Sequence, residues 1–186
     1  MAITAEAGMA RALLERLEAE GKLDEALRYE ILNGELVIGG APRVRHQEAV
    51  HVLLEHFRPW VRRHGGAAFT GMGIEIGGQQ LIPDLSFIGS DRAGELDADG
   101  CRVPPDLVAE VTSPGTRSVD LHEKRDIYAR IGVGEYWVVD LTREVVLVHH
   151  RDEAGAFAVT EHTHGTLSTP AAPGLAVPVD EVLAAG

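Results

Sequence analysis

The sequence predicts a mixed α/β fold in which a central sheet is flanked by helices. Three segments, 9–20, 44–64 and 118–131, repeat apolar residues every three or four positions, the spacing of an amphipathic helix. Between them lie short runs rich in Val, Ile and Leu, bounded by Gly, Pro or Asn-Gly, which are typical of strands. The 186 residues have the length of one ordinary globular domain with a buried core.

The first half of the chain begins with a short helix and a hairpin. Leu13, Leu14 and Leu17 lie at helical spacing, and Gly21 ends that run. Asn33-Gly34 predicts a hairpin, because this dipeptide readily adopts the positive φ angles of a type I′ turn. The expected elements of this half are a helix at 9–20, strands at 29–32 and 35–38, a long helix at 44–64, and strands at 67–76 and 79–88.

The second half is expected to begin with an exposed acidic loop, 89–102. An apolar strand with one carboxylate, 106–112, follows and ends at Ser113-Pro114-Gly115. The remaining expected elements are a helix at 118–131 and strands at 135–140, 144–149 and 157–161. The tail contains prolines 170, 173 and 178, so we expect it to wrap the surface before a last turn at 180–183.

Composition narrows the class of protein. The amino terminus is too charged for a secretory signal, and no stretch has the roughly 18 apolar residues of a membrane helix, so a cytoplasmic protein without membrane contact is expected. Cys101 is the only cysteine, which excludes an intrachain disulfide and a thiolate zinc cluster. We expect a lead-in helix, residues 1–22, before a single domain, residues 23–186.

Charge is unevenly distributed along the chain. The net charge of -12 argues against attraction of the whole surface to a polyanion. The long helix and its approach, however, carry five arginines against Glu48 and Glu55: Arg43, Arg45, Arg58, Arg62 and Arg63. A basic helix beside an acidic pocket suits an enzyme that acts on a phosphodiester, and a solvated helix face is the alternative.

Asp84 and Glu110 are the candidate metal ligands. Asp84 follows Pro83 at the start of an apolar run, and Glu110 lies inside an apolar strand. A carboxylate in such a place is costly to bury unless it is paired or coordinates a cation. Magnesium binds through one or two carboxylates and retains several waters. The alternative is that each carboxylate points to solvent from an edge strand.

Lys124 is a candidate because the chain has fifteen arginines and only two lysines, Lys22 and Lys124. A lysine ammonium is a compact donor that can orient an attacking water, whereas guanidinium is bulkier. The alternative is a simple ion pair within the helix, with Asp120 four residues earlier.

A series of motifs resembles the Uma-two family of restriction-endonuclease-like proteins, within the PD-(D/E)xK nuclease superfamily. The similarity runs from about Tyr29 to the carboxyl terminus, and the ordered series is more specific than any one motif. The matching positions are Tyr29-Glu30, Asn33-Gly34-Glu35, His46, Pro83-Asp84, Pro104 to Val108, Glu110-Val111, Ser113-Pro114, Thr116, Lys124, Tyr128, Gly132-Val133 and Glu135 to Asp140.

This resemblance implies a restriction-endonuclease-like fold, with a central mixed sheet flanked by helices, and a DNA endonuclease that uses Mg²⁺ or Mn²⁺. It implies metal ligands at Asp84 and Glu110, assisted by Glu30. The superfamily pattern has lysine two residues after the strand glutamate, where this chain has Thr112. The resemblance suggests that Lys124 takes over that role. A homodimer is expected by analogy, since a lone nuclease domain commonly pairs to cut both strands.

Four further residues are candidates for substrate contact: His46, Arg43, Arg45 and Thr112. His46 precedes the long helix and is suited to a phosphate or to the attacking water, and a packing role is equally compatible with its position. The paired histidines at 149–150, and those at 162 and 164, lie near expected turns, so we expect them to be solvated. Tyr128, one turn after Lys124, is expected to hold that lysine in place.

Two other functions remain open from the sequence. One is a catalytically silent protein of the same fold that binds nucleic acid or a partner protein, which Thr112 and the net charge favour. The other is an interaction domain whose acidic residues only solvate its surface. The second alternative requires Asp84, Glu110 and Lys124 to lie far apart.

Overall fold

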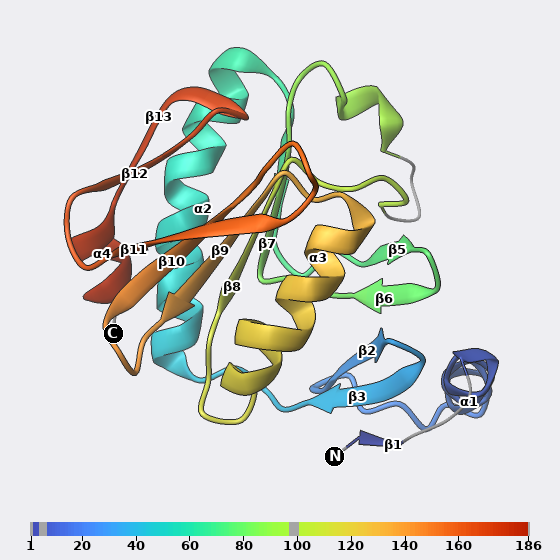
Figure 1. Ribbon diagram of the computed structural model, residues 1–186. Coiled ribbons are helices and arrows are strands. Elements are labelled where there is room, and N and C mark those ends of the chain that lie inside the picture. The colour runs from blue at the N-terminus through green and yellow to red at the C-terminus, as the bar shows by residue number, and fades with distance from the viewer. Residues whose placement is uncertain (1, 4–6, 97–100, 186) are drawn as a thin grey trace.

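A six-stranded mixed sheet forms the centre of the protein (Figure 1). The structure is a computed structural model, and it describes residues 2–3, 7–96 and 101–185. The strand order of the sheet is β11-β10-β9-β8-β7-β4, and β8 and β9 are its parallel pair. The strands are β4 (Ala67–Phe69), β7 (Leu85–Ile88), β8 (Leu107–Val111), β9 (Glu135–Asp140), β10 (Val145–Arg151) and β11 (Phe157–His162).

Helices α2 (Val44–His64) and α3 (Arg125–Ile131) cover opposite faces of this sheet (Figure 1). α2 packs through Leu53, Phe57 and Trp60 on a face that includes Trp137 of β9. α3 packs on the other face, against Tyr136. Neighbouring residues of a strand point to opposite faces, so Tyr136 and Trp137 join different halves of the core. The predicted α/β class, with a central mixed sheet between helices, is confirmed.

A second sheet, in the order β1-β3-β2-β6-β5, lies beside the central one. Its strands are β1 (Ala2–Ile3), β2 (Arg28–Leu32), β3 (Glu35–Gly39), β5 (Ile74–Ile76) and β6 (Gln79–Leu81). The hairpin between β2 and β3 turns at Asn33 and Gly34, with φ of 51° and 84°, as the sequence predicted. α1 (Ala7–Ala19) packs on this hairpin through Ala10 and Leu14.

Several expected elements differ in the structure. The two expected strands at 67–76 and 79–88 are four short strands in two sheets, because the backbone turns at Gly71 and at Pro83-Asp84 and passes from one sheet to the other. The expected acidic loop contains a short helical turn, η1 (Ala93–Glu95), and its end at Cys101 is buried rather than exposed. Residues 97–100 of that loop lie outside the described residues.

The tail is more regular than its prolines suggested. β12 (Thr166–Thr169) and β13 (Ala172–Pro178) pair as a hairpin that packs on α2, and α4 (Val179–Leu183) follows. Leu175, Val177 and Val182 are buried in the core on the α2 side. In the described part of the chain, no helix is long and apolar enough to cross a membrane.

The helix that precedes α3 is wound more loosely than an α-helix. Its turns η2 (Val119–Lys124) are π-helical and continue directly into α3. Single π-helical turns inside helices are frequent at functional sites. Here the segment buries Asp120 and Lys124 on the side that faces the sheet.

Candidate active site

A cavity of about 340 Å³ opens where the two sheets meet the beginning of α2 and the π-helical turns. Arg28 and Glu30 reach it from β2, Asp84 from the start of β7, and Glu110 from β8. Asp120 and Lys124 line it from η2, and Arg43 and His46 from the start of α2. Segments distant in sequence therefore place four carboxylates and several basic groups around one cavity.

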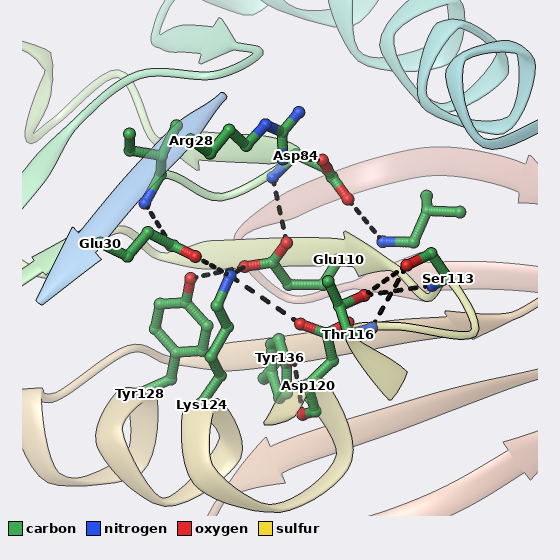
Figure 2. A network of polar contacts seen from close by, with 12 residues as sticks. Arg28, Glu30, Asp84, Glu110, Ser113, Thr116, Asp120, Lys124, Tyr128 and Tyr136 are labelled. Carbon is green, nitrogen blue, oxygen red and sulfur yellow. Dashed lines mark hydrogen bonds and ion pairs between the residues drawn. The ribbon is translucent and has the colours of Figure 1, made fainter. Parts of the chain in front are cut away.

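Lys124 is the hub of the polar network (Figure 2). Its Nζ lies 2.9 Å from Glu30 Oε2, 2.9 Å from Glu110 Oε1 and 3.8 Å from Asp120 Oδ1. The same oxygen of Glu110 accepts a 2.8 Å hydrogen bond from the Tyr128 hydroxyl. Tyr128 therefore fixes the carboxylate that Lys124 contacts, rather than Lys124 itself as the sequence analysis expected.

Asp84 is held by partners other than Lys124. Its Oδ1 accepts a 2.5 Å contact from Arg28, and its Oδ2 accepts from the Val111 amide at 2.8 Å and from His46 Nε2 at 3.0 Å. The Asp84 amide in turn donates to Glu110 Oε2 at 3.4 Å. The two candidate metal ligands are thus linked directly to each other.

The basic neighbours set the ionisation of Asp84. Burial raises the pKa of this carboxyl group, but the hydrogen bond and charge of His46, together with Arg28 and the Val111 amide, lower it to about 2. Asp84 is therefore ionised at neutral pH.

The other side of the cavity is short of positive charge. Burial, and then the carboxylates of Asp84, Asp120 and Glu30, raise the pKa of Glu110 well above its usual range despite Lys124. Burial likewise raises the pKa of Asp120 to about 6, against the opposing effects of Lys124 and of a hydrogen bond from Thr116. Burial opposes the charge of Lys124, but its three carboxylate neighbours raise its pKa and keep it protonated.

The donor set fits a divalent cation bound through few protein ligands. A carboxylate oxygen can accept about two hydrogen bonds, and Asp84 Oδ1 and Glu110 Oε2 each have one recorded partner in the described part of the chain. The cavity is lined by four carboxylates and by three permanently charged cations, Arg28, Arg43 and Lys124. No group of three His, Cys, Asp or Glu residues among those described could hold an ion. Such a cation would therefore use these two carboxylates and water.

The structure gathers most of the residues that the sequence singled out. Asp84, Glu110, Lys124 and Glu30 contact one another or share a partner, and His46 and Arg43 line the same cavity. Glu30 also accepts a 2.7 Å hydrogen bond from the Ile82 amide, which ties β2 to the segment before Asp84. The alternative in which the acidic residues and Lys124 lie far apart is contradicted by these contacts.

Two candidates for substrate contact lie outside the cavity wall. Arg45 donates to the Leu183 carbonyl at 3.2 Å and lies 4.0 Å from Glu144, on the side toward α4. Thr112 is buried, its amide donates to the Val139 carbonyl, and its hydroxyl has no partner among the described residues. The superfamily pattern has a lysine at position 112, and in this chain the ammonium beside Glu110 comes from Lys124 on the neighbouring helix.

The expectation of solvated histidines was wrong for His149, whereas the side chain of His150 is 44% exposed. His149 is buried and stacks on Tyr136 with ring centroids 5.6 Å apart, and burial, with Arg125 and His150, lowers its pKa to about 4. His150 pairs with Glu135 at 3.0 Å. Both stand on β10, which extends to Arg151, two residues beyond the predicted end of that strand.

Arg28 is the residue of the cavity that the sequence analysis missed. No motif marks it, but it lies two positions before Glu30 on one strand, and alternate residues of a strand share a face. Its contact with Asp84 follows from that spacing once Glu30 is placed in the site. Asp120 was considered only as a helical partner of Lys124, and the structure adds it to the acidic cluster.

Comparison with solved structures supports this fold. The chain resembles the crystal structure of a protein from Anabaena variabilis described as a putative nuclease belonging to DUF820, with a TM-score of 0.74 and 18% sequence identity. The match covers 90% of this chain and 97% of that one. At this identity, the likeness concerns the fold.

Two further comparisons bear on the family. None of the curated proteins compared with this chain matches it. The family model Uma2, described as "Putative restriction endonuclease", matches residues 12–180, nearly the whole chain. The family expected from the ordered motifs is therefore confirmed, and the chain belongs to the Uma2 family of restriction-endonuclease-like proteins.

Proposed function

We propose that this protein is a Mg²⁺- or Mn²⁺-dependent endonuclease that hydrolyses phosphodiester bonds in DNA. The observation that carries the proposal is the convergence of Asp84, Glu110 and Glu30 with Lys124 around one cavity. Family membership supports a nuclease, and restriction-endonuclease-like families generally use divalent metal ions. A cytoplasmic location is part of the same proposal.

In the proposed reaction, Asp84 and Glu110 would hold the metal ion, since Asp84 Oδ1 and Glu110 Oε2 have spare acceptor capacity. A bound Mg²⁺ would neutralise charge on the phosphate oxygens and acidify the attacking water. Lys124 is protonated, so it serves as a hydrogen-bond donor and not as a base. From between Glu30 and Glu110 it orients the water and opposes the negative charge that develops on the phosphate.

Glu30 and Tyr128 keep these groups in place. Glu30 accepts from both Lys124 and the Ile82 amide, so one carboxylate joins the lysine to the segment that carries Asp84. Tyr128 holds Glu110 from the same side as Lys124. Burial raises the pKa of the Tyr128 phenol well above its usual range, so it remains a donor.

Calorimetry with Mn²⁺ tests the metal site separately from cleavage. We expect the wild-type protein to bind Mn²⁺ and Asp84→Ala to lose that binding, because one of two protein ligands is removed. Asp91→Ala is the matched control, since Asp91 is an exposed acidic residue outside the cavity. Equal Mn²⁺ binding by both variants would contradict the proposed ligands.

Cleavage of DNA tests the activity. With Mg²⁺ or Mn²⁺ we expect cutting by the wild type, and a loss of at least about 100-fold in Glu110→Gln, which keeps the shape of the side chain but not its charge. If Mn²⁺ binds but no panel of plasmid and oligonucleotide substrates is cut, the alternative of a silent nucleic-acid or protein binding module is favoured.

A further inference from the structure

The amino-terminal end of α2 opens into the same cavity and is not capped. α2 is 21 residues long, and Arg43 before its first turn makes no side-chain capping hydrogen bond. The first backbone bond of the helix in this region runs from the Gln47 amide to the Arg43 carbonyl. The preceding amides, at positions 44–46, are the N–H groups that a helix leaves without internal partners.

The charge at this helix end is also reversed from the usual pattern. The positive end of the helix dipole normally attracts acidic side chains. The first turn of α2 has no acidic residue; Arg43 and His46 line the cavity there, and Arg45 lies on the side toward α4. Arg43 and Val44 are exposed, so a ligand in solvent can reach the helix end. Basic side chains, free amides and the helix dipole all favour an anion at this place.

His46 provides an independent indication that a ligand binds here. Its residue exposure is 8%, and Nε2 is engaged by Asp84 at 3.0 Å. The other ring nitrogen, Nδ1, is buried and has no hydrogen-bond partner in the part of the chain that the structure describes. A buried polar atom normally has a partner, and His46 lines the cavity. The ring is thus held by Asp84 with one hydrogen-bonding atom unused.

The loop before α2 leaves room for a ligand close to the backbone. Gly39, Gly40, Ala41 and Pro42 line the cavity together with Arg43. No atom lies within 4 Å of the place where a side chain would begin at Gly40. Across the cavity lies the Ser113–Thr116 loop, whose own hydroxyls and amides bond to one another. The polar groups of that loop are thus largely paired with one another, whereas no bond to a described residue is seen for the amides at positions 44–46.

We propose that the amino terminus of α2, with Arg43 and His46, is a phosphate subsite that binds a DNA phosphate next to the bond that is cut. This inference rests on the proposed function for the identity of the substrate. The contact of His46 with Asp84 places the subsite directly beside the candidate metal ligands. The subsite holds the DNA backbone by phosphate contacts, which position the strand without selecting a base sequence.

The test uses inorganic phosphate with metal-free protein, followed by NMR of the backbone amides and the His46 ring. We expect the amides of Val44, Arg45 and His46 to shift on titration. Arg43→Glu should weaken phosphate binding about tenfold or more, the effect of losing a charge-assisted contact. Arg58→Glu is the matched control, because it makes the same change of charge at an exposed position further along the same helix.

Equal affinities in the two variants, or shifts confined to residues away from the start of α2, would overturn the subsite. The activity is tested apart from it, since phosphate binding is measured without metal and without cleavage. Glu110→Gln should abolish cleavage and leave phosphate binding within about twofold. Phosphate binding by a wild-type protein that cuts no DNA would reject the proposed function and keep the subsite.

Discussion

Lys124 joins three acidic side chains that come from three different elements. Its ammonium is buried between Glu30, Glu110 and Asp120, at 2.9, 2.9 and 3.8 Å. A compact ammonium can be shared among carboxylates that approach from several directions, whereas a planar guanidinium is suited to bidentate contacts. This geometry gives a physical reason for a lysine in a chain that otherwise uses arginine almost throughout.

Replacing Lys124 with a neutral residue leaves its three buried carboxylate neighbours without the ammonium that they share. We predict that Lys124→Gln abolishes cleavage and lowers the free energy of unfolding at pH 7 by about 3–5 kcal/mol, as expected when one partner of a buried ion pair is removed. Lys22→Gln is the control, since Lys22 is the only other lysine and is exposed beside Glu20. Its effect should remain within about 0.5 kcal/mol by urea denaturation. Equal destabilisation by both variants would contradict the role of Lys124.

The pKa of Asp120 predicts a pH dependence of stability. Its folded-state pKa is raised from 3.8 to about 6, so the folded protein binds a proton that the unfolded chain releases between these values. This group therefore lowers stability as pH rises from about 4 to about 6. In Asp120→Asn that penalty is absent, so the variant should gain up to about 3 kcal/mol relative to wild type between pH 4 and pH 7.

Urea denaturation at several pH values measures this difference, and the change with pH separates titration from the constant loss of contacts to Lys124. Asp84→Asn serves as the comparison. In the wild-type protein the pKa of Asp84 is lowered to about 2, so the stabilising contribution of this carboxylate is lost as pH falls from about 4 to about 2. A difference between Asp120→Asn and wild type that stays constant from pH 4 to pH 7 would show that Asp120 has no raised pKa.

At the residue scale, the sequence identified side chains whose chemistry is visible in a motif. The sequence singled out Asp84 and Glu110 because a carboxylate among apolar residues is costly to bury without a partner. It singled out Lys124 because lysine is rare in this chain. Arg28 has no such local mark, since its importance comes from a contact with a residue 56 positions away. His149 was misplaced because its burial depends on packing against Tyr136 of β9 and Phe157 of β11, which no local pattern reports.

At the element scale, segments with strong local signals were predicted well. The Asn33-Gly34 hairpin and the helix Val44–His64 depend on turn chemistry and on one apolar stripe, both of which are local. The β12–β13 hairpin was missed because three prolines weakened the strand signal, although one of them, Pro178, ends β13 and another, Pro170, stands between the strands.

The connection between α2 and β4 depends on a glycine that tolerates no side chain. Gly66 has φ of +90°, and a Cβ there would lie 2.6 Å from the Ile88 carbonyl oxygen. We predict that Gly66→Ala destabilises the protein by about 2 kcal/mol or more, because both the backbone angle and the close approach oppose it. Thermal and urea unfolding measure the effect.

Gly73→Ala provides the matched control for this substitution. Gly73 has no positive φ, and no atom lies within 4 Å of a Cβ placed there. Its replacement should change stability by less than about 1 kcal/mol. Equal effects at the two glycines would contradict the account of this connection.

At the scale of the whole molecule, the sequence predicted the fold class but not the way the site is assembled. Strands and helices alternate along the chain, which is sufficient for a sheet between helices. The meeting of β2, β7, β8 and the π-helical turns at one cavity depends on the order of strands in two sheets, which local patterns leave open. The resemblance to the family, and not the local patterns, indicated that Glu30, Asp84 and Glu110 belong to one site.

The proposed homodimer is a prediction about the whole molecule. The described part of the chain forms one candidate site, and nuclease domains with one site commonly pair to cut both strands of a duplex. We expect sedimentation equilibrium at micromolar concentration to give twice the chain mass of 20.0 kDa, and duplex DNA to be cut in both strands. A monomer that nicks only one strand would contradict the prediction and leave the chemistry of the site unchanged.

A crystal grown with Mn²⁺ tests the central claim most directly, since the metal is located by its anomalous scattering. We predict one peak in the cavity within about 2.1–2.3 Å of oxygens from both Asp84 and Glu110, with waters completing its coordination. An ion bound elsewhere, or a cavity that stays without metal at millimolar Mn²⁺ while the two carboxylates keep their contacts to Arg28 and Lys124, would contradict it.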